Sequence, residues 1–152
     1  MPLREKLSTN LKSAMKNKEV DRLMTLRLIN AAIKDRDIAL RGEGQSDGAT
    51  EGDILAILAK MVKQRHESAR SYEEAGRLEL AERELAEVKV ISDFLPAQLS
   101  EAQTEAAVDA AITDVGAESI RDMGKVMGVL KGKYTGQMDF GSVGPMVKAR
   151  LG

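Results

Sequence analysis

The sequence predicts an all-α protein: an N-terminal bundle of about four helices, then a small three-helix domain. Apolar residues recur at spacings of three and four along nearly the whole chain, and no segment alternates with the period of a strand. The 152 residues suffice for one ordinary domain or two small ones. Pro96 ends one helical pattern and Ser100 begins another, which predicts domains over 1–95 and 101–152 with a linker at 96–100.

The first two helices follow from their apolar spacing. The first has apolar residues in steps of four, at Leu3, Leu7, Leu11 and Met15. The second runs from Val20 to about Arg41, and its apolar residues spread widely enough to place it centrally in the bundle. They are Leu23, Leu26, Leu28, Ile29 and Ile33. Four glycines in residues 42–52 then predict a mobile loop.

Two further helices complete the predicted bundle. Thr50 is expected to cap the third, with Asp53 in its first turn. The inward positions of this helix are Ile54, Leu58, Met61, Arg65, Ala69 and Tyr72. Gly76 interrupts the pattern, and Pro96 ends the fourth helix. The expected seam of that helix is Leu78, Ala81, Leu85, Val88, Ser92 and Leu95.

Three short helices are expected in the C-terminal domain. Ser100 and Gln103 form a capping box for the first, which Gly116 closes. Ser119 is expected to cap the second, with Met123, Val126, Met127 and Leu130 inward. After a turn over 134–138, Asp139 is one candidate cap for the last helix. A start at Gly144, with Pro145 as the first helical residue, is favoured because proline disrupts a helix interior.

Composition excludes several classes of protein chemistry. The sequence has no Cys, so disulfides, thiol catalysis and cysteinyl metal sites are excluded. The N-terminal stretch lacks the apolar centre of a secretory signal, and no run approaches 18 apolar residues, so a cytoplasmic protein is expected. The net charge of -1 conceals blocks: residues 101–122 carry one basic residue against six acidic, and residues 123–152 carry five basic against Asp139 alone.

The basic C-terminal block contains a glycine at every fourth position: Gly124, Gly128, Gly132 and Gly136. Each glycine costs a helix interior about 1 kcal/mol relative to alanine, so a bare backbone surface is expected to have a use. Residues four apart share one helical face, which places the first three glycines in a strip beside Lys125 and Lys131. Close helix packing and close approach of an anionic ligand both fit this pattern.

Candidate catalytic residues are scarce. His66 is the only histidine, and the sequence after it lacks the second ligand of a HExxH zinc site. The glutamates of residues 73–87 have the spacing of exposed helix faces. Walker, Rossmann and nucleophile-elbow motifs are absent. We therefore expect no catalytic residue, no metal site and no cofactor in the isolated chain.

Several segments together resemble the GatB/YqeY family. They are KMVKQR at 60–65, SY at 71–72, AGR at 75–77, LAERE at 80–84, FLPAQL at 94–99 and DMGKVMG at 122–128. The resemblance extends from Thr25 through Gly136 and Asp139 to the C-terminus. It implies a helical N-terminal domain and a C-terminal domain similar to the tail of the B subunit of the tRNA-dependent amidotransferase. In that enzyme the tail grips the outer corner of tRNA, and the kinase and transamidation chemistry lies in another domain.

The resemblance implies a tRNA-binding accessory protein, with shape recognition of tRNA and no DNA or membrane partner. The expected tRNA-binding residues are Gly124, Lys125, Gly128, Lys131, Gly132, Lys133 and Tyr134. Lys148 and Arg150 are expected to extend the basic patch, while Pro145 and the Gly141-Ser142 pair depart from the family pattern.

Two alternatives remain at this stage. The family association implies a carbon-nitrogen ligase activity with glutamine as amido-N-donor, although no residues for ATP handling or glutamine hydrolysis are recognisable. The second alternative is an interaction module whose N-terminal domain docks on an aminoacyl-tRNA synthetase or an amidotransferase subunit. Four arginines are compatible with docking or with structural ion pairs: Arg22, Arg27, Arg65 and Arg70.

Overall fold

The computed structural model describes residues 2–45 and 47–152 of the chain. These residues form seven α-helices and one 3₁₀ turn, without a strand, and 79% of the structure is helical. The predicted all-α fold class is therefore confirmed. The chain divides into two compact units, which we call unit 1, up to Leu95, and unit 2, Pro96–Gly152.

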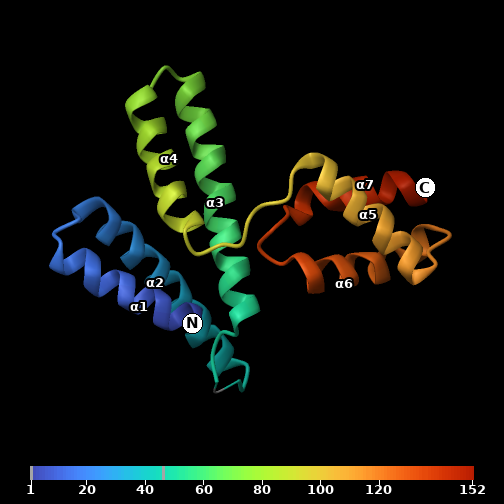
Figure 1. The fold of residues 1–152 in the computed structure, drawn as a ribbon, viewed down its shortest axis with the longest axis horizontal. Helices are drawn as coiled ribbons and strands as arrows, with labels where there is room; N and C mark the ends of the chain where they lie inside the picture. The colour runs from blue at the N-terminus through green and yellow to red at the C-terminus, as the bar shows by residue number, and fades with distance from the viewer. Residues whose placement is uncertain (1, 46) are drawn as a thin grey trace. The chain divides into compact units, whose positions relative to one another are not determined.

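Unit 1 consists of two helical hairpins (Figure 1). Its helices are α1 (Leu3–Lys16), α2 (Val20–Gly42), α3 (Glu51–Glu74) and α4 (Leu78–Ser92). Helix α2 contacts the other three helices, which is the central position that its apolar residues predict. The core of the unit is built from fully buried aliphatic side chains, among them Leu26, Ile29, Ile54, Leu58 and Ile91.

The second hairpin has the ends that the sequence predicts. The Thr50 hydroxyl accepts a hydrogen bond from the Asp53 amide, and the Asp53 carboxylate accepts one from the Thr50 amide. Gly76 has a φ of 73°, a left-handed conformation that suits the tight connection between α3 and α4. Arg65 of α3 donates to Glu87 of α4 over 2.8 Å, which joins the two helices.

Three predicted inward positions of unit 1 are wrong. Met15 is exposed and Ala14 is buried in its place, because steps of four residues drift away from a helix period of 3.6. In α4, Leu78 and Ser92 are exposed, whereas Ile91 and, just after the helix, Phe94 are buried. Ile91 and Phe94, rather than Ser92, therefore face the core of unit 1 at this end of the helix.

The predicted mobile loop is anchored at its end toward α3. The Ala49 amide donates to Asp37 over 2.7 Å, and Arg4 donates both to the Ala49 carbonyl and to Asp37. A Cβ atom at Gly48 would lie 2.6 Å from the Asp37 carboxylate. Ala49 is buried, so this end of the loop packs against unit 1, while Ser46 lies outside the described residues.

Unit 2 contains three helices, which share one aliphatic core; Figure 1 shows their arrangement. They are α5 (Glu101–Val115), α6 (Met123–Tyr134) and α7 (Phe140–Leu151), with the single 3₁₀ turn η1 (Ile120–Asp122) before α6. The core side chains come from all three helices: Val108, Val126, Leu130, Val143 and Val147. The capping box of Ser100 and Gln103 and the left-handed Gly116 both occur as predicted.

The predicted start of the last helix at Gly144 is wrong. Helix α7 begins at Phe140, the Asp139 carboxylate accepts from the Gly141 amide over 2.9 Å, and Pro145 lies inside the helix. Proline removes the hydrogen bond that would end on the Gly141 carbonyl. Both residues are exposed, so water can satisfy that carbonyl.

Candidate nucleic-acid interface

The glycine strip, which we define as Gly124, Gly128 and Gly132, is open to solvent on α6. All three residues are exposed. A Cβ atom at any of them would have no neighbour within 4 Å outside its own helix backbone. Close packing of another helix of unit 2 therefore does not explain these glycines. The strip exposes about two turns of helix backbone with no side chain above it.

The fourth glycine of the series has a different role. Gly136 is buried and has a φ of 81°, a conformation that disfavours residues with a Cβ atom. It lies in the turn between α6 and α7, where its carbonyl accepts a hydrogen bond from the Gln98 side chain. The Leu99 amide also donates to the Gln137 carbonyl in the same turn, over 2.9 Å. Gly136 therefore shapes the turn and is not part of the exposed strip.

Two lysines flank the glycine strip. With 100° per residue, Lys125 and Lys131 lie on opposite sides of the strip, each about 60° from its centre. Both are exposed, and neither forms an ion pair within 4.0 Å with any residue that the structure describes. Helix α6 contains no acidic residue. The ammonium groups of these two lysines are therefore available to an anion that contacts the strip.

The other predicted binding residues are less available. Lys133 points away from the strip, and its ammonium group lies 4.0 Å from the Asp114 carboxylate of α5. Tyr134 is half-buried and packs against the core of unit 2. In α7, Arg150 is paired with Asp109 over 2.6 Å, whereas Lys148 is exposed. Sequence reasoning placed all of these in one patch, but the helical faces separate Lys133 from Lys125 and Lys131.

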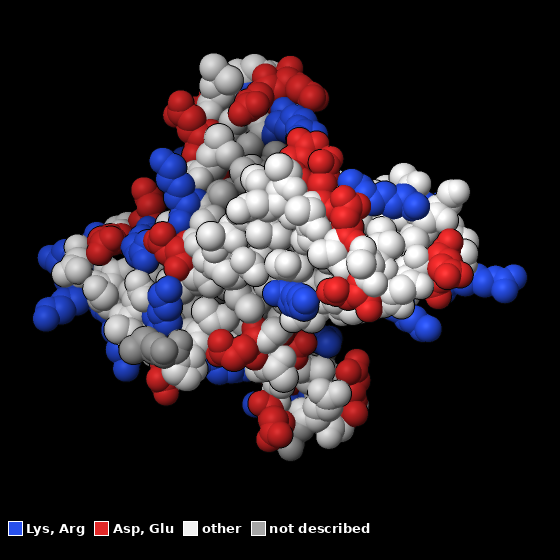
Figure 2. Space-filling model, turned by 45° about the vertical axis from the view of Figure 1, so that its right-hand side comes forward, with Lys and Arg blue, Asp and Glu red and all other residues white. Residues whose placement is uncertain are grey.

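Acidic side chains limit how an anion can approach. Asp122, just before α6, accepts hydrogen bonds from the amides of Glu118 and Ser119, which lower the pKa of its carboxyl. Helix α5 carries four acidic residues and no basic one. On the face drawn in Figure 2, acidic and basic side chains are mixed. Attraction of a polyanion therefore depends on the local lysines of α6 rather than on a general positive field.

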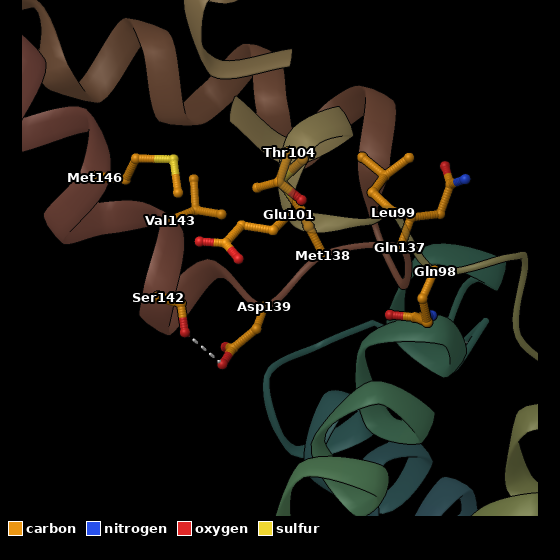
Figure 3. A pocket seen from close by; sticks show the side chains of 10 residues that line it. All are labelled: Gln98, Leu99, Glu101, Thr104, Gln137, Met138, Asp139, Ser142, Val143 and Met146. Atoms are coloured by element: carbon orange, nitrogen blue, oxygen red, sulfur yellow. Dashed lines mark hydrogen bonds between the residues drawn. The ribbon is translucent and has the colours of Figure 1, made fainter. Parts of the chain in front are cut away.

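Sequence reasoning missed a pocket of about 400 Å³ in unit 2. Figure 3 shows its lining. The residues are Gln98, Leu99, Glu101, Thr104, Gln137, Met138, Asp139, Ser142, Val143 and Met146. Apolar side chains form part of the lining, Glu101 and Asp139 bring two carboxyl groups, and no basic residue takes part. This lining does not suit a phosphate. Asp139 had a sequence signal as a helix cap, and Gln98 and Leu99 lie in the FLPAQL segment, but no motif predicted a pocket between them.

The histidine and the arginines of unit 1 lie on its helices. His66 is exposed on α3. Within residues 2–45 and 47–152, no three His, Cys, Asp or Glu side chains cluster closely enough to hold a metal ion. Arg65 pairs with Glu87, and Arg22 pairs with Asp93 over 2.9 Å, so these two arginines serve as structural partners. None of the described helices is both long and apolar enough to cross a membrane.

The fold and the surface define an all-helical, two-unit protein with an open glycine-lysine face on its C-terminal unit. Residues 4–151 match the family of YqeY-like proteins. The chain belongs to this family, which confirms the resemblance seen in its motifs.

Three fungal proteins are similar to the chain. A Clavispora lusitaniae protein named "Altered inheritance of mitochondria protein 41, mitochondrial" is 35% identical over 89 residues, which cover 59% of this chain and 49% of the relative. The protein of the same name in Lachancea thermotolerans is 30% identical over 109 residues, which cover 72% of this chain and 55% of the relative. An uncharacterized Schizosaccharomyces pombe protein is 28% identical over 90 residues, which cover 59% of this chain and 69% of the relative. The matched regions thus span about half the length of the two mitochondrial relatives.

Proposed function

We propose that this chain is a tRNA-binding accessory protein and that the glycine strip of α6 is its contact surface. The observation that carries the proposal is the open strip itself: three exposed glycines without neighbours, between two exposed and unpaired lysines. Glycine lets another backbone come close to the helix, and the ammonium groups on either side attract phosphates. A contact of this kind reads the path of a folded backbone rather than a base sequence.

The arrangement favours a structured RNA over an extended strand. The glycine strip and its two lysines extend over only about two turns of helix, so they can contact a short stretch of sugar-phosphate backbone held in a fixed shape. The half-buried Tyr134 ring is the single aromatic side chain of α6, which is a poor platform for stacking successive unpaired bases. Double-stranded or otherwise folded RNA, such as tRNA, therefore fits better than single-stranded RNA.

A titration of labelled tRNA with the full chain tests the proposal. Fluorescence anisotropy should show that binding weakens as the salt concentration rises. The logarithm of the association constant should fall by about 0.7 to 0.9 per log unit of salt for each phosphate that the protein neutralises. An unstructured RNA of equal length is the control and should bind at least about tenfold more weakly. Equal affinity for both RNAs, or binding that salt leaves unchanged, would contradict the proposed recognition of a folded backbone.

The cellular compartment is part of the same proposal. We infer a location where tRNA is used in translation, either the cytoplasm or the matrix of mitochondria. The names of two relatives place those proteins in mitochondria. Cell fractionation followed by immunodetection distinguishes the two locations, and recovery outside both would contradict the proposal.

A further inference from the structure

Unit 1 leaves one face of its central helix uncovered. Val20, Met24 and Ile38 of α2 are 63%, 59% and 56% exposed. Between them lie Leu28, which is 45% exposed, and Ala31, which is also exposed. The opposite side of α2 is buried against the other helices of the unit. Scattered apolar residues on a surface need no explanation, but a row along five turns of one helix indicates a contact surface.

Two pairs of residues on the uncovered face lie symmetrically about Ala31. Met24 precedes Ala31 by seven residues and Ile38 follows it by seven, so both lie two turns away on nearly the same side. Arg27 precedes Ala31 by four residues and Asp35 follows it by four. Arg27 and Asp35 are exposed, and neither has an ion-pair partner within 4.0 Å in the part of the chain that the structure describes. The face thus carries opposite charges at equal distances from a small central residue.

We propose that a second copy of this chain covers this face, with the two α2 helices antiparallel and Ala31 on the two-fold axis. In this register Met24 of each copy faces Ile38 of the other, and Arg27 of each copy faces Asp35 of the other. Each of these two contacts occurs twice, as a closed two-fold interface requires. The small Ala31 side chain lets the helices approach closely where they cross.

The charges select the antiparallel orientation. A parallel in-register pair would place Arg27 against Arg27 and Asp35 against Asp35, and both contacts are repulsive. The antiparallel pair replaces these two like-charge contacts with two attractive ones. One helix face is smaller than a standard interface of roughly 1,600 Å², so the dimer should be weak and concentration-dependent. The inference rests on unit 1 alone and is independent of RNA binding by unit 2.

Sedimentation of the full chain tests the proposal directly. The weight-average mass should rise from monomer toward dimer between about 1 µM and 0.5 mM protein. Met24→Glu should keep the chain monomeric over this range, since it buries a charge in the contact. A wild-type chain that stays monomeric up to about 0.5 mM, or a dimer unaffected by Met24→Glu, overturns the proposal.

Charge exchange tests the register. Arg27→Glu and Asp35→Arg should each weaken the dimer by at least about tenfold, because each creates two like-charge contacts. An equimolar mixture of the two variants should regain association, since the introduced carboxylate at position 27 meets the introduced guanidinium at position 35. The double variant R27E/D35R should regain it as well. Failure of both the mixture and the double variant to recover overturns the antiparallel register.

Cysteine cross-linking gives an independent test, because the chain has no cysteine of its own. Ala31→Cys should form a disulfide-linked dimer under mild oxidation, since the two Cα atoms on the axis come within the range of about 4.4–6.8 Å that a disulfide needs. Ala39→Cys is the matched control: it is exposed on the same helix, yet its two copies lie about 24 Å apart along the axis. Equal cross-linking of both variants overturns the proposed register.

Discussion

Replacing Gly128 by alanine should stabilise the protein and weaken its binding of tRNA. The residue lies in the middle of α6, it does not have a positive φ, and a Cβ atom there meets nothing within 4 Å. Alanine therefore fits without strain and removes the entropic cost of a helical glycine, about 0.5–1 kcal/mol. If unit 2 unfolds as its own cooperative domain, its melting temperature should rise by roughly 2–8 °C.

The same methyl group occupies the space through which we propose that the RNA backbone approaches. We expect tRNA affinity to fall about three- to tenfold, equivalent to roughly 0.7–1.4 kcal/mol. Calorimetry measures the stability and anisotropy measures the binding. Gly52→Ala is the matched control, because Gly52 is an exposed helical glycine of α3 whose Cβ would make only an ordinary contact of 3.8 Å. This control should leave tRNA affinity unchanged.

Two results would refute the reasoning about Gly128. A destabilised Gly128→Ala protein would mean that the space above the helix is occupied rather than open. A stabilised protein with wild-type tRNA affinity would mean that no ligand uses the bare backbone, and the cost of the glycines would need another explanation. The combination of higher stability and weaker binding is expected only if the strip is a contact surface.

Three further changes test the fold. A hydrogen bond from Arg4 and a weaker contribution from the Ala49 amide hold the pKa of Asp37 at about 2. The ionised Asp37 carboxylate therefore stabilises the fold above about pH 4, and this stabilisation is lost as pH falls toward 2. Asp37→Asn should remove this part of the acid-unfolding curve. Gly48→Ala should destabilise unit 1 by about 1–3 kcal/mol in urea unfolding, because it adds a Cβ to a residue with a φ of 76° and 2.6 Å from Asp37. Pro145→Ala should raise the thermal stability of unit 2 by up to about 3 kcal/mol, since it restores a helical hydrogen bond, and no gain would contradict our description of α7.

Local chemistry made most helix boundaries predictable. The capping boxes at Thr50 and Ser100 and the left-handed glycines at 76 and 116 depend on neighbouring residues only, so the sequence carries the complete signal. Helix α7 was not predictable in this way. Its start depends on competition between the Asp139 cap and the disruption by Pro145, and the exposure of Gly141 decides that competition.

The candidate site was predictable only in part. A spacing of four residues places three glycines on one face, but it does not say whether that face is buried or open, because the answer depends on which side of α6 packs on α5 and α7. Lys133 was grouped with Lys125 and Lys131 by its position in sequence, whereas the helix turns it toward Asp114. The pocket beside Asp139 is formed by segments about 40 residues apart, so the local signal of the Asp139 cap did not predict it.

The most direct test of the proposed function is the tRNA affinity of the double variant Lys125→Glu/Lys131→Glu. Lys133→Glu is the control, since that lysine lies off the strip. We predict that the double variant loses at least about a hundredfold in affinity at physiological salt and that its salt dependence becomes shallower. The control should lose less than about threefold. Wild-type affinity in a correctly folded double variant would contradict the account, because the strip would then have no part in binding RNA.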